Sequence, residues 1–378
     1  MVSRLGGWQF ETRFCCQGAA GDLQAAGQPA LSEIVPNKRK PRRKGAGVTM
    51  ADVAAEAGVS MQTVSRALRS PETVMPETRG LIEAAISKTH YVQNVAASQL
   101  ASSRSFTVAA IIPTLSTSVF AETIQSLSDT LVRKGYQLFV GHTDYRQDRE
   151  EDLIRTLLGR RPDGLFVIGT RHTRKSTALM KRAGIPIVEG WDWTERPIDR
   201  LVGFSNADAM DGIVGHLAAR GRTRPVFAGV LRPGDSRARQ RRDGFIAAVA
   251  RMWPDIEPRL VDASDLSLTM DAGAEVLRRV EAQHPDADAI VLSSDITAAG
   301  LLLACQRRGI AVPERFAITG FGDFEVSRNL IPSLTTIAVP ANLIGAEAGR
   351  LLLEAMSGEA STPKKVDVGF ELIVRESS

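Results

Sequence analysis

The stretch VTMADVAAEAGVSMQTVSRAL, residues 48–68, decides the fold of the N-terminal part of this chain. In its first half, apolar residues recur at the spacing of one helix face: Met50, Val53, Ala54 and Ala57. Thr49 can cap the start of this helix, and Gly58 can end it because glycine adopts the left-handed conformation without steric cost. Ser60 can then cap a second helix. The pattern predicts two short helices joined by a tight turn.

The second predicted helix has one apolar face and one polar face. Its inward positions are Val64, Ala67 and Leu68, and its outward positions are Gln62, Ser65, Arg66 and Arg69. Glutamine pairs with adenine and arginine with guanine, while short hydroxyl side chains such as Thr63 and Ser65 can bind phosphates. Helix-turn-helix proteins place the start of such a helix, here Met61 and Gln62, nearest the bases. The alternative is an ordinary helical hairpin with a polar outer face.

The segment resembles the headpiece of the Lac-repressor and galactose-repressor family of transcriptional regulators. The family signature is close to V-T-hydrophobic-x-D-V-A-x-x-A-G-V-S-x-x-T-V-S-R, and every defined position is matched here. The resemblance continues to Arg375, and it is greatest to the gluconate-repressor branch. It implies binding to double-stranded DNA. The expected DNA contacts are Thr49, Met50, Ser60, Met61, Gln62, Thr63, Ser65, Arg66, Arg69, Tyr91, Asn94, Ala97, Leu100 and Ala101.

A segment at residues 91–105 follows a third predicted helix at about residues 78–89. Within it, Val95, Ala96, Ser98 and Gln99 can form a helix of barely two turns, which is marginal in water by itself. The resemblance implies a hinge helix that enters the minor groove, where Leu100 would separate a base step and kink the DNA. Gln93 replaces the proline that usually precedes Asn94, so we expect a looser hinge. The alternative is a linker between domains with a buried leucine.

Composition limits the class of protein. The 378 residues carry a formal net charge of +4, and no apolar run of about 18 residues predicts a membrane span. The N-terminus lacks the pattern of a signal peptide, and three cysteines neither form a disulfide framework nor suggest a metal site. We therefore expect a cytoplasmic protein without a cofactor. Residues 1–45 are either a disordered basic tail or the product of a start codon assigned too early, and residues 46–90 form the DNA-binding domain.

From residue 106 onwards, short apolar runs alternate with helical stretches in two series. Such alternation predicts parallel sheets covered by helices on both faces, and two series predict two doubly wound α/β subdomains. The family resemblance implies the fold of type I periplasmic sugar-binding proteins, in which the chain crosses between two lobes three times. We expect an effector-binding and dimerisation domain at 106–375, with an N-lobe of about 106–205 plus 337–364 and a C-lobe of about 206–336 plus 365–375.

Ligands of open α/β sheets bind beyond the carboxyl ends of the strands. The resemblance places a ligand-binding arginine at Arg241, suited to a bidentate hydrogen bond with a carboxylate or vicinal hydroxyls. Trp191 is a candidate for an apolar wall of the site. Gly322 replaces an acidic residue of several sugar-binding members, which argues against a neutral sugar. Glu189 is either a ligand contact or an ion-pair partner within the lobe. The expected effector contacts are Phe120, Asp192, Arg241, Ser294, Asp295 and Asp323.

Three neighbouring arginines, Arg237, Arg239 and Arg242, are expected to be surface charges at the start of a helix. His142 and His172 are expected to be structural or on the surface.

These features favour an effector-responsive repressor, a homodimer that binds a pseudo-palindromic operator and responds to a small sugar acid such as gluconate. The alternatives are a regulator that responds to a neutral sugar or a purine, and a transport-linked sugar-binding protein. An enzyme is disfavoured because no G-x-G-x-x-G follows the first strand and neither a P-loop nor G-x-S-x-G occurs.

Overall fold

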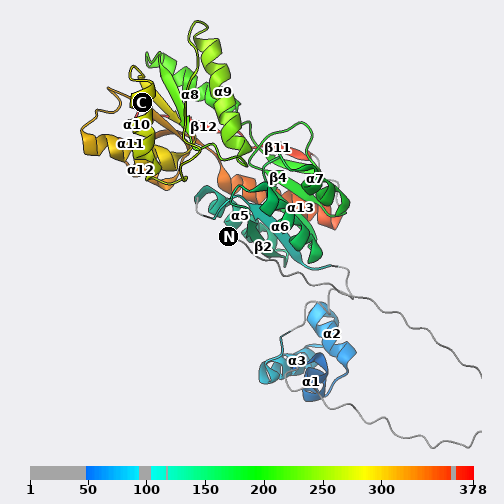
Figure 1. Cartoon of the computed structure of the whole chain (residues 1–378). Coiled ribbons are helices and arrows are strands. Elements are labelled where there is room, and N and C mark those ends of the chain that lie inside the picture. Colours follow the sequence, from blue (N-terminus) through cyan, green and yellow to red (C-terminus); the bar gives the residue numbers. More distant parts are fainter. Residues whose placement is uncertain (1–47, 93–103, 116–117, 359–362) are drawn as a thin grey trace, which may run out of the picture. The chain divides into compact units, whose positions relative to one another are not determined.

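The computed structural model describes residues 48–92, 104–115, 118–358 and 363–378. The chain divides into two compact units, residues 1–93 and 94–378, and each is described by itself (Figure 1). No helix in the described ranges is long and apolar enough to cross a membrane. Across the same residues, no group of three or more His, Cys, Asp or Glu side chains is placed to hold a metal ion.

The N-terminal unit is a small helical domain. Its helices are α1 (Met50–Ala57), α2 (Met61–Arg69), the short 3-10 helix η1 (Pro71–Thr73) and α3 (Pro76–Thr89). Ser60 Oγ accepts from the NH of Thr63 at 3.1 Å, so the predicted cap of α2 is present. At α1 it is the Asp52 carboxylate that accepts, from the backbone NH of Thr49 at 2.8 Å. Gly58 ends α1 with a φ of 66°, in the left-handed region that favours glycine. The predicted helix-turn-helix is confirmed.

Apolar side chains from all three α-helices form the core of this domain. Val53 and Val64 are fully buried and Ile82 nearly so, and Tyr91, just after α3, packs in the same cluster. The third helix therefore closes a core that two helices cannot complete.

The first sheet of the large unit defines the N-lobe. Its strand order is β11-β5-β4-β3-β1-β2, and all of its pairings are parallel. The strands are β1 (Thr107–Ile112), β2 (Gln137–His142), β3 (Gly164–Ile168), β4 (Ile187–Gly190), β5 (Arg200–Gly203) and β11 (Lys365–Asp367).

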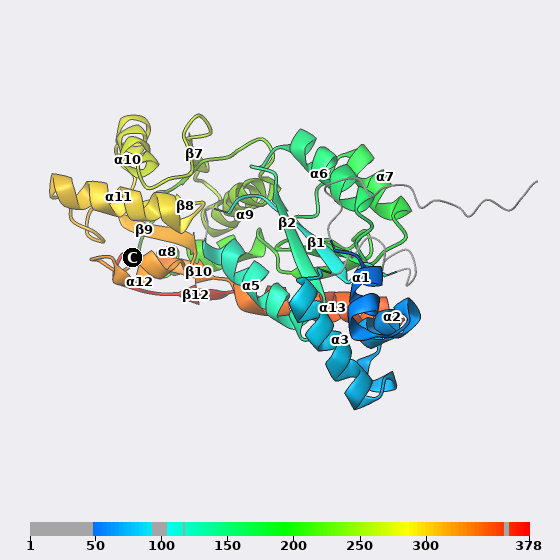
Figure 2. The same ribbon diagram turned by 90° about the horizontal axis from the view of Figure 1, so that it is seen from below.

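Helices cover both faces of this sheet. They are α5 (Ser118–Val132), α6 (Gln147–Gly159), α7 (Arg174–Arg182) and α13 (Ala341–Ser357). Alternate residues of β1 point to opposite faces. Val108 and Ala110 belong to the core that includes side chains of α5 and α13, whereas Ala109 and Ile111 pack with those of α6 and α7. Figure 2 shows α6 and α7 on the other side of β1 and β2 from α5 and α13.

The second sheet defines the C-lobe and has the order β12-β10-β9-β8-β6-β7. Its strands are β6 (Pro225–Gly229), β7 (Arg259–Asp262), β8 (Ala289–Leu292), β9 (Ala317–Gly322), β10 (Thr335–Ala338) and β12 (Glu371–Ile373). Its helices are α8 (Asp208–Ala219), α9 (Ser236–Met252), α10 (Ala272–Gln283), α11 (Asp295–Arg308) and α12 (Glu325–Asn329). All pairings are parallel except that of β12 with β10. The predicted fold class of two doubly wound subdomains is confirmed.

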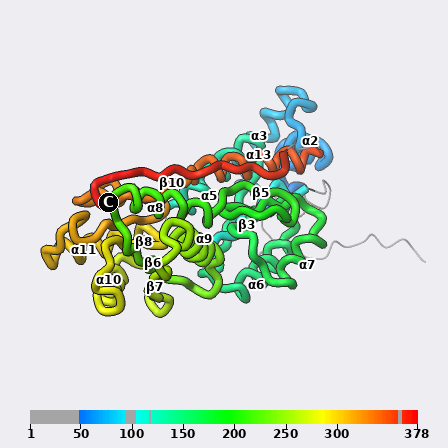
Figure 3. Tube along the Cα trace, turned by 90° about the horizontal axis from the view of Figure 1, so that it is seen from above, coloured from blue at the N-terminus to red at the C-terminus, as the bar shows by residue number. Residues whose placement is uncertain are grey.

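The chain passes between the lobes after β5, after β10 and between β11 and β12. Two of these crossings differ from the expected boundaries by a few residues. Strand β10 pairs with β9 as far as Ala338, beyond the expected start of the second N-lobe segment at 337. Strand β11 pairs with β5, so residues 365–367 belong to the N-lobe and not to the C-lobe. Figure 3 shows this C-terminal segment running from beside β5 to beside β10.

Candidate functional site

A cavity lies between the two lobes at the carboxyl ends of their strands, and we call it the effector pocket. It encloses about 550 Å³, including its open mouth. Its N-lobe wall comes from α5 and from the segments that follow β2 and β4. Its C-lobe wall comes from the first half of α9, the end of β9 and the segments after β6, β7, β8 and β9. The lining residues are Val119, Phe120, Tyr145, Trp191, Val230, Asp235, Arg237, Ala238, Arg241, Leu268, Ser293, Ser294, Phe321, Gly322 and Phe324.

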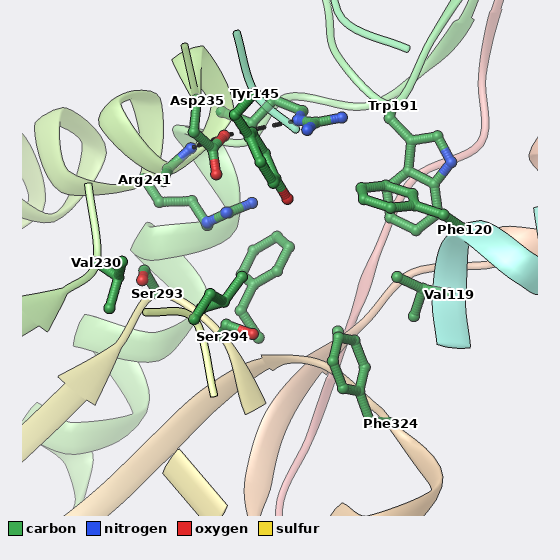
Figure 4. Close-up of a pocket in the computed structure, with 15 residues that line it drawn as sticks. Val119, Phe120, Tyr145, Trp191, Val230, Asp235, Arg241, Ser293, Ser294 and Phe324 are labelled. Atoms are coloured by element: carbon green, nitrogen blue, oxygen red, sulfur yellow. Dashed lines mark hydrogen bonds and ion pairs between the residues drawn. The ribbon is translucent and has the colours of Figure 1, made fainter. Parts of the chain in front are cut away.

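Aromatic rings form one side of the effector pocket. The rings of Phe120 and Trp191 meet edge to face with their centroids 5.1 Å apart, as Figure 4 shows. The indole NH of Trp191 donates to Thr123 Oγ1 at 3.0 Å, which fixes the ring and satisfies its polar atom. Such a rigid aromatic wall suits the apolar CH face of a sugar-like ligand.

Arg241 forms the opposite side of the effector pocket, on α9. Its Nη1 donates to Asn206 Oδ1 at 2.7 Å, and its guanidinium carbon lies 4.3 Å from the centre of the Phe321 ring. Its Nε is buried without a hydrogen-bond partner among the described residues. Burial lowers the pKa of Arg241 from its usual value, but a guanidinium remains charged at neutral pH. The position agrees with a ligand-gripping role, which stays a prediction.

Arg237 also lines the effector pocket and is 94% buried, being 6% exposed, so the expectation of a surface charge is wrong. It lies four residues before Arg241 on α9, and positions i and i+4 share one helix face. That spacing is the signal in the sequence that could have identified it. Its Nη1 is buried and has no hydrogen-bond partner in the described part of the chain. Its guanidinium carbon lies 5.2 Å from the centre of the Phe120 ring.

Tyr145 and Asp235 line the effector pocket and were not foreseen from the sequence. Burial raises the pKa of Tyr145 to about 12, so its hydroxyl stays protonated and can donate a hydrogen bond. Asp235 caps α9 by accepting from the NH of Ala238 at 3.1 Å, and its Oδ1 lies 3.9 Å from Arg237 Nε. Its carboxylate therefore balances part of the charge of the two arginines.

Of the six expected effector contacts, Phe120, Arg241 and Ser294 line the pocket, whereas Asp192, Asp295 and Asp323 do not. The expectation for these three aspartates needs correction because protein groups already bind their carboxylates. Asp192 accepts from Thr170 Oγ1 at 2.8 Å and from Gln240 Nε2 at 3.1 Å, which links the N-lobe to α9. Asp323 forms an ion pair with Arg375 at 2.6 Å.

Asp295 is fully buried beneath the pocket rather than exposed to it. It accepts hydrogen bonds from Thr336 Oγ1 at 2.6 Å, from Ser327 Oγ at 2.7 Å and from the NH of Phe324 at 2.9 Å. Burial raises the pKa of Asp295 to about 6, against the opposing effect of these hydrogen bonds. Because Phe324 lines the pocket, Asp295 is a positioning residue for that wall.

Two other arginines of α9 behave as expected at the surface or near it. Arg239 Nη1 donates to the carbonyl groups of Arg232 and Pro233 at 3.0 and 2.6 Å. Arg242 pairs with its neighbour Asp243 at 2.7 Å. Neither residue lines the effector pocket.

Glu189 belongs to an ion-pair cluster inside the N-lobe and does not line the pocket. His172 Nδ1 lies 2.9 Å from Glu150 Oε1, and its Nε2 lies 3.4 Å from Glu189 Oε1. Burial lowers the pKa of His172, but its interactions with the two carboxylates outweigh burial and raise the pKa to about 9. The histidine is structural, as expected.

This cluster predicts how the stability of the large unit depends on pH. Because the folded-state pKa of His172 is raised, its stabilising effect is complete below its usual pKa of 6.5 and is lost as the pH rises through about 9. We expect His172→Ala to lower the free energy of unfolding at pH 6 by about 3 kcal/mol, since it leaves buried carboxylates without their partner. Denaturant unfolding of the full chain at pH 6 and pH 9 measures both effects.

The matched control is the exposed His142, whose replacement by alanine should change stability by no more than about 0.5 kcal/mol. The unmodified chain should lose stability between pH 6.5 and pH 9 as His172 is deprotonated. If the free energy of unfolding of His172→Ala fell by the same amount over this pH range, a group other than His172 would cause the loss.

The candidate DNA-binding surface lies on α2. Met61, Gln62, Arg66 and Arg69 are exposed, and Thr63 and Ser65 are half-buried beside them. Arg69 Nε donates to the carbonyl of Ser65 at 3.3 Å. Thr49 and Ser60 are exposed at the starts of α1 and α2, and Met50 is half-buried.

The remaining expected DNA contacts fall into two groups. Tyr91 is only 9% exposed and packs in the core of the helical domain, which argues against a contact made by its ring. The other four lie outside the described residues: Asn94, Ala97, Leu100 and Ala101.

Gln62 offers a test of base readout, because it lies exposed at the start of α2. We expect Gln62→Ala to reduce discrimination at one base pair of the operator by about 1–3 kcal/mol, the usual effect of losing a bidentate contact. Binding to a panel of operators with single base changes measures this. An equal loss on every DNA sequence would instead identify a phosphate contact.

Comparisons with known proteins find relatives of both the N-terminal helical unit and the large α/β unit. Residues 49–94 match the family model described as bacterial regulatory proteins, lacI family, and residues 214–378 match a periplasmic binding protein-like domain. The chain is 34% identical over 348 residues to the HTH-type transcriptional regulator GntR of Pseudomonas aeruginosa, covering 91% of this chain and 99% of that protein. It is 30% identical over 326 residues to the HTH-type transcriptional regulator IdnR of Escherichia coli, covering 86% and 97%.

Solved structures give the same result. A lacI-family transcriptional regulator from Silicibacter pomeroyi superimposes with a TM-score of 0.81 at 31% identity, covering 87% of this chain and 99% of that one. The transcription regulator GntR from Chromobacterium violaceum gives a TM-score of 0.67 at 36% identity, covering 72% and 99%. These relatives are regulators, not enzymes. The chain belongs to the lacI family of bacterial regulatory proteins and is a DNA-binding transcriptional regulator.

Proposed function

We propose that this regulator represses genes of sugar-acid catabolism and that an aldonic acid of the gluconate type is its effector. The observation that carries this proposal is the charge of the effector pocket. Arg237 and Arg241 line it with only one carboxylate, that of Asp235, between them. The Nε of Arg241 is buried and no described protein group satisfies it, and such an atom is costly unless a ligand supplies an acceptor.

The walls of the effector pocket define the rest of the ligand. The rings of Phe120 and Trp191 offer an apolar surface on one side. The hydroxyl groups of Tyr145, Ser293 and Ser294 offer hydrogen bonds on the other. A short polyhydroxylated chain that ends in a carboxylate matches both kinds of wall. The relatives named GntR and IdnR support a ligand of this class.

The position of the pocket between the lobes supplies the means of control. A ligand that contacts both lobes stabilises the arrangement in which they lie close together, and it shifts the protein toward that state by its difference in affinity. We propose that this change alters residues 91–105 and releases the DNA. The regulator acts as a cytoplasmic homodimer on a pseudo-palindromic operator, because the described part of each chain offers one candidate recognition helix, α2, and two-fold symmetry pairs two half-sites.

The test uses the purified full-length chain. Selection from a random DNA pool should yield a sequence with two-fold symmetry, and gluconate should then weaken its retention in gel-shift assays, whereas glucose and hypoxanthine should not. Failure to select any sequence would refute the operator proposal. A response to glucose or hypoxanthine alone would replace the sugar acid by a neutral sugar or a purine.

A further inference from the structure

A second cavity adjoins the effector pocket and differs from it in character. It encloses about 390 Å³, including its open mouth, and it shares Tyr145 and Arg237 with the effector pocket. These two side chains therefore form the boundary between the cavities. The residues that line the second cavity are Pro113, Thr143, Tyr145, Arg146, Gln147, Glu150, Ile168, Gly169, Arg171, Gly234, Ser236 and Arg237.

Two helices begin at the second cavity. Gln147 is the first residue of α6, and Ser236 and Arg237 are the first two residues of α9. The helix dipole places partial positive charge at the start of each helix, although at α9 the NH of Ala238 already donates to Asp235 and the NH of Ser236 to the carbonyl of Gly234. The two helices come from different lobes, so a group bound here would contact both. Their convergence favours an anion.

The charged side chains that line the second cavity are also mainly positive, which again favours an anion. Three arginines line the second cavity, Arg146, Arg171 and Arg237, with a single carboxylate, that of Glu150. Arg146 pairs with Asp148, and Glu150 lies 2.9 Å from His172. Arg171 has no ion pair or hydrogen bond with any residue that the structure describes.

Arg237 supplies the independent evidence for a ligand. Its side chain is more than nine-tenths buried at the boundary of the two cavities. Its Nη1 has no hydrogen-bond partner within the described ranges, although a buried guanidinium nitrogen almost always has one. An acceptor on a bound ligand would satisfy it.

We propose that the second cavity binds a phosphate group, so that the effector is a sugar acid phosphorylated at the end remote from its carboxylate. This inference rests on the proposed function, which assigns the carboxylate to Arg241 in the effector pocket. A phosphate carries up to two negative charges and three acceptor oxygens, enough for Arg171, Arg237 and the positive ends of the two helices. A second carboxylate has one charge and two oxygens and leaves more of these donors unsatisfied.

Isothermal titration of the full chain with gluconate, 6-phosphogluconate, glucarate and inorganic phosphate tests the proposal. We expect 6-phosphogluconate to bind at least about ten-fold more tightly than gluconate, a difference of about 1.4 kcal/mol. Glucarate, which carries a carboxylate in place of the phosphate, should gain less. Inorganic phosphate alone should bind weakly because it reaches only one cavity.

Two arginine variants locate the effect. Arg171→Gln should bring the affinities for 6-phosphogluconate and gluconate close together, because Arg171 lines the second cavity but not the effector pocket. Arg174→Gln removes an exposed arginine of the same lobe that lines neither cavity, and it should keep the ten-fold difference.

Each result has a distinct meaning. Equal affinities for gluconate and 6-phosphogluconate in the unmodified chain would overturn the phosphate site and leave the proposed function intact. An equal gain with glucarate would overturn phosphate in favour of a general anion. If none of the sugar acids bound, the proposed function and this inference would both fail.

Discussion

Replacing Arg241 by glutamine is expected to weaken gluconate binding by about 10- to 100-fold while operator affinity stays unchanged. Arg241 lines the effector pocket, where its guanidinium donates to Asn206 and lies over the Phe321 ring. A hydrogen bond to a charged group contributes about 1.5–3 kcal/mol, and each 1.4 kcal/mol is ten-fold in affinity. Calorimetry measures the loss of ligand binding, and gel shifts without ligand measure operator affinity.

The matched control is the next residue on the same helix. Arg242 pairs with Asp243 at the surface and does not line the pocket, so Arg242→Gln should bind gluconate normally. A variant at Arg241 that still released the operator at the usual gluconate concentration would remove this residue from the ligand site.

The second large effect is expected from Gly234→Ala, which acts on the contact between the lobes. An added Cβ at Gly234 would lie 1.6 Å from the carbonyl oxygen of Tyr145, so the C-lobe backbone must move away from the N-lobe loop after β2. The neighbouring interaction of Arg232 with Asp144, at 3.3 Å, crosses the same junction. Overpacking of this kind costs about 1–3 kcal/mol, or about 5- to 150-fold in the affinity of a ligand that needs the lobes together.

Small-angle scattering and calorimetry together test this expectation. Gly234→Ala should increase the radius of gyration of the ligand-free protein and weaken gluconate binding. Gly212→Ala in α8 is the control, because nothing lies within 4 Å of an added Cβ there. Normal gluconate affinity in Gly234→Ala would mean that the contact with Tyr145 does not matter for ligand capture.

The sequence was sufficient for those parts of the fold that follow from local patterns. The apolar stripes and caps predicted α1 and α2, and the alternation of apolar runs with helical stretches predicted two parallel sheets. The third crossing was misplaced by a few residues because β11 is only three residues long. Whether Lys365–Asp367 pairs with one sheet or the other depends on a partner strand far away in the sequence.

The candidate site shows a similar limit. Phe120, Arg241 and Ser294, which the family resemblance led us to expect at the ligand, do line the pocket. Arg237 was assigned to the surface, since arginine is rarely buried, although its spacing of four residues from Arg241 places both on one face of α9. Asp295 was expected at the ligand because it follows a strand, but hydroxyl groups from two distant segments enclose it.

Asp295 stabilises the wall of the effector pocket but does not itself line the pocket. It holds the frame of the loop that carries Phe324 and does not itself face the cavity. The residues that read the chemistry of the effector can therefore be exchanged during evolution while the scaffold beneath them persists. Substitutions at the surface of the cavity can therefore change which ligand fits without disturbing the hydrogen bonds that hold this loop.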